Sequence, residues 1–284
     1  MPKANLPTRL PGYTLLLATL MLAMSAAASP LQLKGAKTQG GVLVGTVPAG
    51  SQVHLDDERL RVNENGQFVL GFDRDASPSA RLLVELPDGQ QYQRELSIEQ
   101  REYDIQHIDG LPPAQVTPPQ EVLDRIRRES AAIGQSRRVD SDRSDFAGDW
   151  IWPAAGQITG VFGSQRVLNG EPRRPHYGLD IAAPIGTPVY APNAGEVVLV
   201  QLDNYYSGHT LIIDHGHELT STYIHLEAIH VEEGQVIEQG QHIADIGETG
   251  RATGPHLDWR LNWRGRRMDP MLVMPSDTPP KLEP

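Results

Sequence analysis

Two short segments in the C-terminal half of the chain carry side chains that could bind a metal ion together. His176 and Asp180 lie four residues apart, and His256 and Asp258 lie two residues apart. Imidazole and carboxylate groups are zinc ligands, and a hydrolytic zinc site needs three protein ligands with one position left open for water. Between these segments, His225 adds an imidazole that could transfer a proton near neutral pH.

In this combination the segments resemble the zinc peptidases of family M23, also called LytM or lysostaphin-type peptidases, which cut the peptide bridges of bacterial cell walls. The resemblance covers roughly residues 152–272 and none of the N-terminal part. Several further stretches fall where that family has its turns: Gly-Val-Phe-Gly at 160–163, Ala-Pro-Ile-Gly-Thr-Pro-Val at 183–189, Ala-Gly-Glu-Val-Val at 194–198 and Ile-Asp-His-Gly at 213–216.

The resemblance implies a role for each of these residues. His176 and Asp180 correspond to two zinc ligands, and His225 and His256 correspond to the catalytic pair that deprotonates water and stabilises the oxyanion. The family normally has His-x-His at the last segment, where the second histidine is the third ligand, but this chain has Asp258 there. A carboxylate can also bind zinc. We therefore predict that His176, Asp180 and Asp258 bind Zn²⁺, with another divalent metal as the alternative.

Asp258 can be interpreted in two ways. Two carboxylates would neutralise a divalent ion, so the bound water would be less acidified. This predicts a higher pH optimum, weaker zinc retention or a preference for a harder metal than in relatives with His-x-His. Alternatively, Arg260 lies two residues further along an expected strand, on the same face, and could pair with Asp258 in place of a metal.

Other residues near these motifs receive weaker predictions. Tyr223 precedes His225 by two residues on an expected strand, so its hydroxyl is predicted to face the same groove. His215 lies in an Asp-His-Gly turn and is predicted to be structural. The remaining histidines of this region are given no role: His209, His217, His230 and His242.

The N-terminus has the pattern of a secretory signal peptide. Lys3 and Arg9 precede an apolar run over residues 15–24 and three alanines at 26–28, which predicts cleavage after about Ala28. The apolar run is shorter than the ~20 residues that span a bilayer, so a retained anchor is the less favoured alternative. We expect a periplasmic mature protein without a stable membrane span.

Charge and cysteine content limit the classes of partner and of covalent linkage. The chain has 284 residues, no cysteine and a formal net charge of −11. The lack of cysteine excludes disulfides and a lipid-modified cysteine. The negative charge argues against nucleic acid as a partner, because phosphate binding requires concentrated Lys and Arg. The arginines at 264, 266 and 267 are predicted to form a solvated loop.

The pattern of short β-prone runs and turns predicts an all-β fold. We expect a signal peptide over 1–28, a small immunoglobulin-like β-sandwich over 29–110, a proline-rich and helical linker over 111–149, an antiparallel M23 peptidase domain with a groove over 150–275, and a tail over 276–284. The clearest expected strands are 42–44, 52–55, 67–70, 81–86, 197–200, 210–213 and 257–261, and a helix is expected over 121–135.

These observations predict a peptidoglycan metalloendopeptidase that hydrolyses cross-link peptides with a metal-activated water. The alternative is a LytM-domain regulator that has lost its metal and activates a separate cell-wall amidase. The N-terminal region or the 111–149 segment could also cover the groove and inhibit the enzyme.

Overall fold

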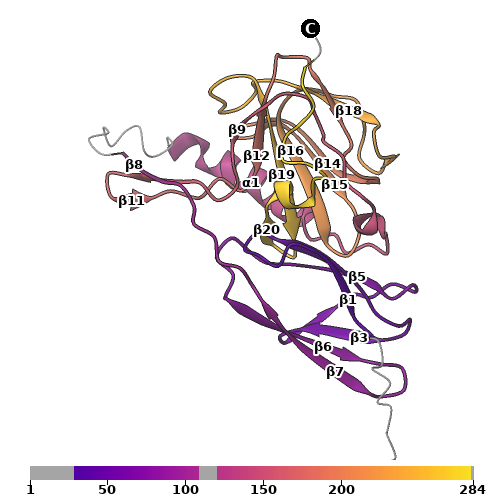
Figure 1. The fold of residues 1–284 in the computed structure, drawn as a ribbon. Coiled ribbons are helices and arrows are strands. Elements are labelled where there is room, and N and C mark those ends of the chain that lie inside the picture. The colour runs from indigo at the N-terminus through magenta and orange to yellow at the C-terminus, as the bar shows by residue number, and fades with distance from the viewer. Residues whose placement is uncertain (1–28, 109–119, 283–284) are drawn as a thin grey trace, which may run out of the picture.

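The computed structural model describes residues 29–108 and 120–282. In this part of the chain the protein consists mainly of β-strands with one α-helix, which confirms the all-β class expected from the sequence (Figure 1). The predicted signal peptide and the prolines at 112–113 and 118–119 lie outside the described residues. None of the described helices is long and apolar enough to cross a membrane.

The N-terminal strands form two antiparallel sheets. The first has the order β1 (Gln32–Gly35), β2 (Val42–Thr46) and β5 (Gln67–Gly71). The second has the order β4 (Glu58–Leu60), β3 (Gln52–Leu55), β6 (Ser79–Glu85) and β7 (Gln91–Ser97). Alternation along β6 buries Ala80, Leu82 and Val84, while the residues between them are exposed or half-buried. These strands therefore pack one face into a core.

The C-terminal strands form one large antiparallel sheet. Its main order is β17 (Val236–Ile237), β14 (Gly195–Asn204), β15 (Gly208–Asp214), β16 (Leu219–Ile229), β19 (His256–Trp263), β12 (Leu179–Ala182) and β9 (Gln157–Gly160). Three more strands attach to it: β13 (Pro188–Tyr190) pairs with β18 (His242–Ile246), β18 also pairs with β16, and β20 (Arg266–Met268) pairs with β19.

Strand β19 has one apolar and one polar face. Its residues at 257, 259, 261 and 263 are Leu, Trp, Leu and Trp, and all four are buried in the core. The alternate residues form what we call the polar face of β19: His256, Asp258, Arg260 and Asn262. Because side chains alternate along a strand, this face is directed away from the tryptophan core.

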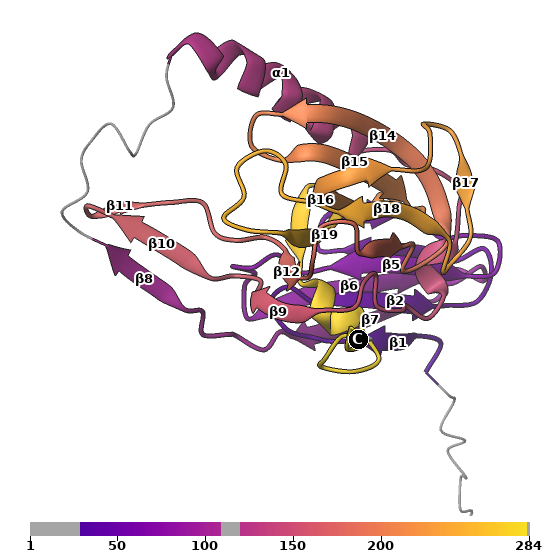
Figure 2. The ribbon, with the colours of Figure 1, turned by 90° about the horizontal axis from the view of Figure 1, so that it is seen from above.

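Segments outside the two regions connect them. Strand β8 (Ile105–Ile108) pairs in parallel with β10 (Gln165–Leu168), which pairs with β11 (Glu171–Pro172). Helix α1 (Gln120–Ser136) lies along β14, as Figure 2 shows. Two 3-10 turns follow, η2 (Asp145–Ala147) and η3 (Pro270–Val273). Arg101 also forms an ion pair with Asp269, with Nη1 2.8 Å from Oδ2, which ties the N-terminal region to the C-terminal one.

The expected elements are present, and one expectation about an exposed segment is wrong. Each expected strand overlaps an observed one, and the helix expected over 121–135 is α1. The segment after α1 has a linker composition but is packed against the sheets, since Arg61 pairs with Asp140 and Asp142. The arginines at 264, 266 and 267 are not a solvated loop. All three are half-buried, and Arg266 pairs with Glu58 at 2.6 Å.

Candidate metal and catalytic site

The strand register brings the two predicted ligand motifs together. Asp180 on β12 lies directly opposite Asp258 on β19. His176 lies in the loop before β12, where its backbone amide donates to the carbonyl of Ser164 at 2.8 Å. Its Nε2 atom is 3.2 Å from Oδ1 of Asp180. One ligand atom from each of His176, Asp180 and Asp258 lies within 4.8 Å of the others.

Two glycines make room for the carboxylates. A Cβ atom added to Gly160 on β9 would lie 2.2 Å from Oδ2 of Asp180, and one added to Gly178 would lie 2.1 Å from Oδ1 of Asp258. At separations this short one group must shift, so each carboxylate keeps its present position only beside a glycine. The glycines within Gly-Val-Phe-Gly and His-Tyr-Gly-Leu-Asp thus leave room for the carboxylates of the site.

The donor atoms of this site fit a cation. Nε2 of His176 and Oδ1 of Asp180 are buried and make no well-formed hydrogen bond, although they lie 3.2 Å from each other. Buried polar groups normally have hydrogen-bond partners, and leaving them without one is costly. Burial alone would lower the pKa of His176, but the carboxylates of Asp180 and Asp258 outweigh it and raise this pKa. The site therefore favours positive charge at this point, which a divalent ion would supply.

Asp258 forms an ion pair with Arg260 on the polar face of β19. Arg260 donates from Nε to Oδ1 at 2.9 Å and from Nη2 to Oδ2 at 2.5 Å. The Asp258 side chain is 4% exposed and that of Arg260 is 25% exposed. Burial raises the pKa of Asp258, but the charge and hydrogen bonds of Arg260, together with the nearby His176 and His225, outweigh burial and hold this pKa at about 2. The pairing expected as an alternative to metal binding is thus present in the structure.

The predicted catalytic histidines lie beside these residues. The ring centroids of His225 and His256 are 4.8 Å apart, and Nε2 of His256 is 3.9 Å from Oδ1 of Asp180. Nδ1 of His225 lies 2.8 Å from the carbonyl of Thr249, and Nδ1 of His256 lies 2.8 Å from that of Gly254. A carbonyl only accepts, so both Nδ1 atoms carry protons and each neutral ring presents a basic Nε2. Burial lowers the pKa of His225, which favours this neutral form.

The prediction that Tyr223 faces the groove is wrong. Its side chain is fully buried, and its hydroxyl lies 2.9 Å from that of Ser221 in the core. Tyr223 pairs with Trp259, whereas the next residue, Ile224, pairs with Asp258. His225 then adopts a left-handed backbone with φ of 64°. This conformation interrupts the alternation of the strand, so residues 223 and 225 do not share a face.

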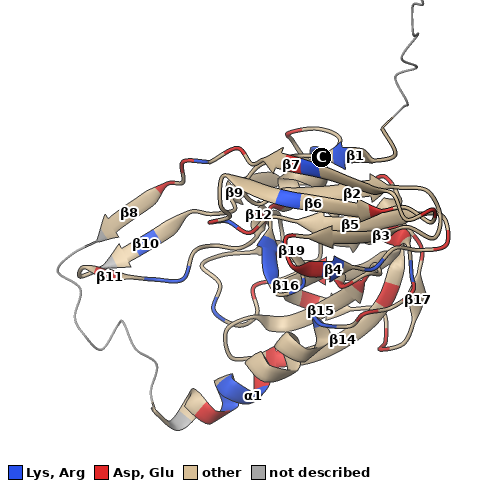
Figure 3. Cartoon of the chain, turned by 90° about the horizontal axis from the view of Figure 1, so that it is seen from below, with Lys and Arg blue, Asp and Glu red and all other residues tan. Residues whose placement is uncertain are grey.

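Two arginines that sequence reasoning missed extend the polar surface beyond Arg260. Arg137, just after α1, donates from Nε to the Thr222 hydroxyl at 3.2 Å. Arg267 on β20 donates to the side-chain oxygen of Asn262. Figure 3 shows the mixed charges of α1 and a basic position on β19, whose one arginine is Arg260. Burial and the neighbouring Arg260 lower the pKa of Arg267 to about 10, which indicates crowded positive charge.

His215 is structural, as predicted. Its Nδ1 lies 2.6 Å from the carbonyl of Ala194, and its Nε2 lies 2.7 Å from the hydroxyl of Ser221. The ring is fully buried, and burial lowers its pKa to about 4. It therefore stays neutral in the folded protein at physiological pH.

Comparison with known proteins agrees with this geometry. Residues 174–270 match the model of Peptidase family M23. Peptidoglycan DD-endopeptidase ShyA of Vibrio cholerae serotype O1 is 42% identical over 125 residues, which are 40% of this chain and 29% of that protein. Peptidoglycan DD-endopeptidase ShyB of the same organism is 44% identical over 97 residues, which are 34% of this chain and 22% of that protein. The chain thus matches less than a third of the length of these curated relatives.

A solved structure extends the likeness to most of the chain. A crystal structure from Pseudomonas aeruginosa assigned to peptidase M23 aligns with 84% of this chain and 94% of its own, with a TM-score of 0.63 and 28% sequence identity. The aligned part is much longer than residues 174–270 and so includes N-terminal strands. The protein therefore carries a domain of peptidase family M23, which confirms the resemblance drawn from the motifs.

Proposed function

We propose that the C-terminal domain is a metal-dependent endopeptidase that hydrolyses peptide cross-links of peptidoglycan. The observation that supports it most is the pair of buried atoms Nε2 of His176 and Oδ1 of Asp180, which face each other at 3.2 Å beside the His225 and His256 rings. Without an ion, these two groups have each other as their nearest polar partner, in a contact that lacks good hydrogen-bond geometry. The two relatives named as peptidoglycan DD-endopeptidases support the substrate class.

His176, Asp180 and Asp258 would hold the ion. Each oxygen of Asp258 can accept a hydrogen bond from Arg260 and still offer a second lone pair. When bound, a zinc ion supplies Lewis acidity that polarises the scissile carbonyl. Arg260 then acts as the partner that orients a ligand carboxylate, as groups that hydrogen-bond to metal ligands do in other sites.

His225 and His256 would move the protons of the reaction. Their Nδ1 atoms are held by backbone carbonyls, so each ring is fixed with Nε2 as its basic atom. One Nε2 accepts the proton of the attacking water, and the resulting imidazolium protonates the leaving amine. The other ring, 4.8 Å away between centroids, stabilises the oxyanion when it carries a proton.

The arginines supply a basis for recognising the substrate. Arg137, Arg260 and Arg267 lie next to the site, and Asp258 is the carboxylate that pairs with one of them. Free carboxylates are abundant in wall peptides built from D-amino acids, and an arginine can bind a carboxylate with two parallel hydrogen bonds. We infer that Arg137 and Arg267 bind a carboxylate of the peptide beyond the scissile bond.

Digestion of purified peptidoglycan tests the proposal. The natural protein loaded with Zn²⁺ should convert cross-linked fragments into uncross-linked ones, as measured by chromatography and mass spectrometry. His176→Ala should lose zinc and activity together, whereas His225→Ala should retain zinc and lose at least about a hundredfold in rate. His107→Gln, an exposed histidine of β8, is the matched control. Stoichiometric zinc without any cleavage would refute the enzymatic function.

The ion pair of Asp258 with Arg260 favours one alternative function. If the guanidinium replaces the metal, the domain is a regulator that binds and activates a cell-wall amidase. In that case the natural protein should hold no zinc even after zinc is supplied. It should also raise the rate of a purified amidase, and His225→Ala should leave that stimulation unchanged.

A further inference from the structure

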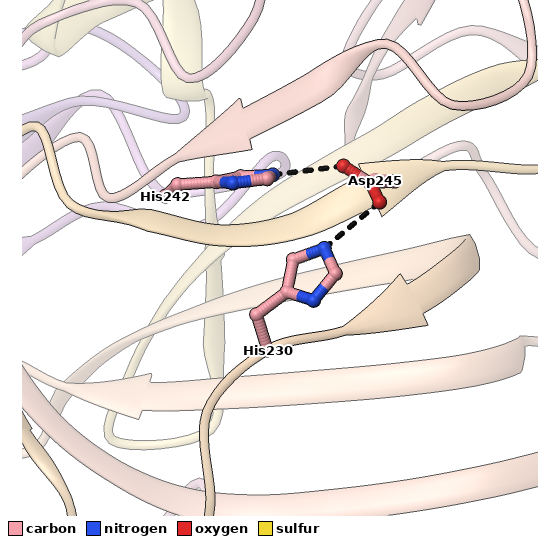
Figure 4. A group of neighbouring side chains, drawn as sticks. All are labelled: His230, His242 and Asp245. Carbon is pink, nitrogen blue, oxygen red and sulfur yellow. Dashed lines mark hydrogen bonds and ion pairs between the residues drawn. The ribbon is translucent and has the colours of Figure 1, made fainter.

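A second cluster of metal-binding side chains lies outside the M23 site. His230 and His242 both contact the carboxylate of Asp245 through their Nε2 atoms, as Figure 4 shows. The two distances are 2.8 Å, to Oδ2 and to Oδ1 respectively. Within the described ranges, this cluster and the His176 site are the two groups of three or more His, Asp or Glu residues whose ligand atoms lie within 4.8 Å of one another.

The backbone holds these three residues in place. His242 begins β18, and Asp245 lies three residues further along it. Residues three apart on a regular strand face opposite sides, but the pairing of β18 with β13 shifts register between the partners of Val189 and Tyr190. Such an irregularity redirects side chains, so His242 and Asp245 reach the same point. His230 follows β16 and is fixed to β18 by its amide, which donates to the carbonyl of Ile243 at 2.9 Å.

The cluster is accessible and has a suitable donor set. Side-chain exposure is 39% for His230, 43% for His242 and 20% for Asp245. The imidazole centroids are 4.5 Å apart, and the His242 ring also packs against Tyr190. Two imidazole nitrogens and one carboxylate oxygen suit zinc, copper and nickel better than magnesium or calcium, which prefer all-oxygen sites. A site of three protein ligands leaves at least one position for water.

We propose that His230, His242 and Asp245 form a second site for a divalent transition metal of the zinc class, on the edge of the sheet formed by β18. The ion replaces the protons that the two Nε2 atoms now direct at the carboxylate. The site shares no residue with the M23 site. It therefore does not depend on whether the domain is an enzyme or a regulator.

Zinc binding by the full chain tests this proposal in a background that lacks the first site. His176→Ala/Asp180→Ala protein is dialysed against Zn²⁺, and zinc per chain is measured by elemental mass spectrometry. We expect about one ion per chain. Adding His242→Gln or Asp245→Asn should weaken binding at least about tenfold, whereas adding His107→Gln should not change it.

Two results would overturn the proposal. The first is that the His176→Ala/Asp180→Ala protein binds no zinc in a saturable way. The second is that adding His242→Gln and adding Asp245→Asn both leave its zinc affinity unchanged. A thermal melt of each variant without metal checks that the fold is kept. If either substitution prevents folding, His230→Gln replaces it with the same expected loss, because all three side chains are at least partly exposed.

Discussion

Arg260 binds both oxygens of the buried Asp258 carboxylate, and Asp258 lies directly opposite Asp180 in the strand register. The sequence presented metal binding by Asp258 and its pairing with Arg260 as alternatives, but one carboxylate can do both. The pair has no net formal charge, like the neutral imidazole found at this position in the M23 pattern. A divalent ion would then meet one uncompensated carboxylate. The higher pH optimum and weaker zinc retention predicted from two carboxylates therefore do not follow from charge alone.

Exchanging Asp258 for histidine should weaken zinc binding unless Arg260 is also changed. The single change leaves a half-buried guanidinium beside the cation without its carboxylate, and such repulsion is costly. We expect Asp258→His to bind zinc at least about tenfold more weakly than Asp258→His/Arg260→Gln, as measured by titration calorimetry with a full double-mutant cycle. Equal affinities for these two variants would contradict charge compensation by Arg260.

Acid should destabilise the protein through His215. Its pKa is about 4 in the fold, where it is buried, but near the ordinary 6.5 in the unfolded chain. As pH falls below about 6.5 the unfolded chain binds this proton first, so the free energy of unfolding falls until about pH 4, by roughly 3 kcal/mol. Above about pH 6.5 this contribution is fully present.

Urea unfolding at pH 7.5, 6 and 4.5 measures the His215 effect. His215→Gln cannot titrate, so its unfolding free energy should vary less over this range than that of the natural protein. His107→Gln, which replaces an exposed histidine of β8, is the control substitution. Identical slopes for His215→Gln and the natural protein would assign the acid sensitivity to other groups.

The ligand motifs were predictable because their positions follow from local rules. Asp258 and Arg260 share a face of β19 because strand side chains alternate, and this places them together whatever the rest of the fold does. The spacing of His176 and Asp180 likewise places both within reach of one point at the start of β12. Local spacing and the family pattern were sufficient for these residues.

The other site features depend on irregular backbone or distant contacts. The left-handed φ at His225 moves Tyr223 off the site face. Histidine is one of the residue types enriched at positive φ, but most histidines do not adopt it, so the residue type alone does not predict this conformation. The register shift in β18 brings His242 and Asp245 together, and the spacing of these residues in the sequence does not predict it. Arg137 reaches Thr222 across 85 residues of sequence, so only the folded chain reveals their contact.

Removing the Tyr223 hydroxyl should affect stability and leave catalysis unchanged. Its hydroxyl contacts that of Ser221 in the core, and burial raises its pKa, so it cannot act as a proton donor to substrate. Tyr223→Phe should lower the free energy of unfolding by about 1 kcal/mol. Its rate of peptidoglycan digestion per folded molecule should match that of the natural protein. A tenfold loss of digestion rate with normal zinc content would show that the Tyr223 hydroxyl takes part in catalysis.

The glycines beneath the two carboxylates should control metal binding more than folding. In Gly160→Ala the new methyl would lie 2.2 Å from Oδ2 of Asp180, and in Gly178→Ala 2.1 Å from Oδ1 of Asp258, so each carboxylate must move. A displacement of this size takes the ligand out of reach of a bond of about 2 Å. We expect at least a tenfold loss of zinc affinity in either variant. Gly134→Ala on α1 is the control, because an added methyl meets no atom within 4 Å there. Zinc affinity and digestion rate equal to this control would show that neither carboxylate needs its present position.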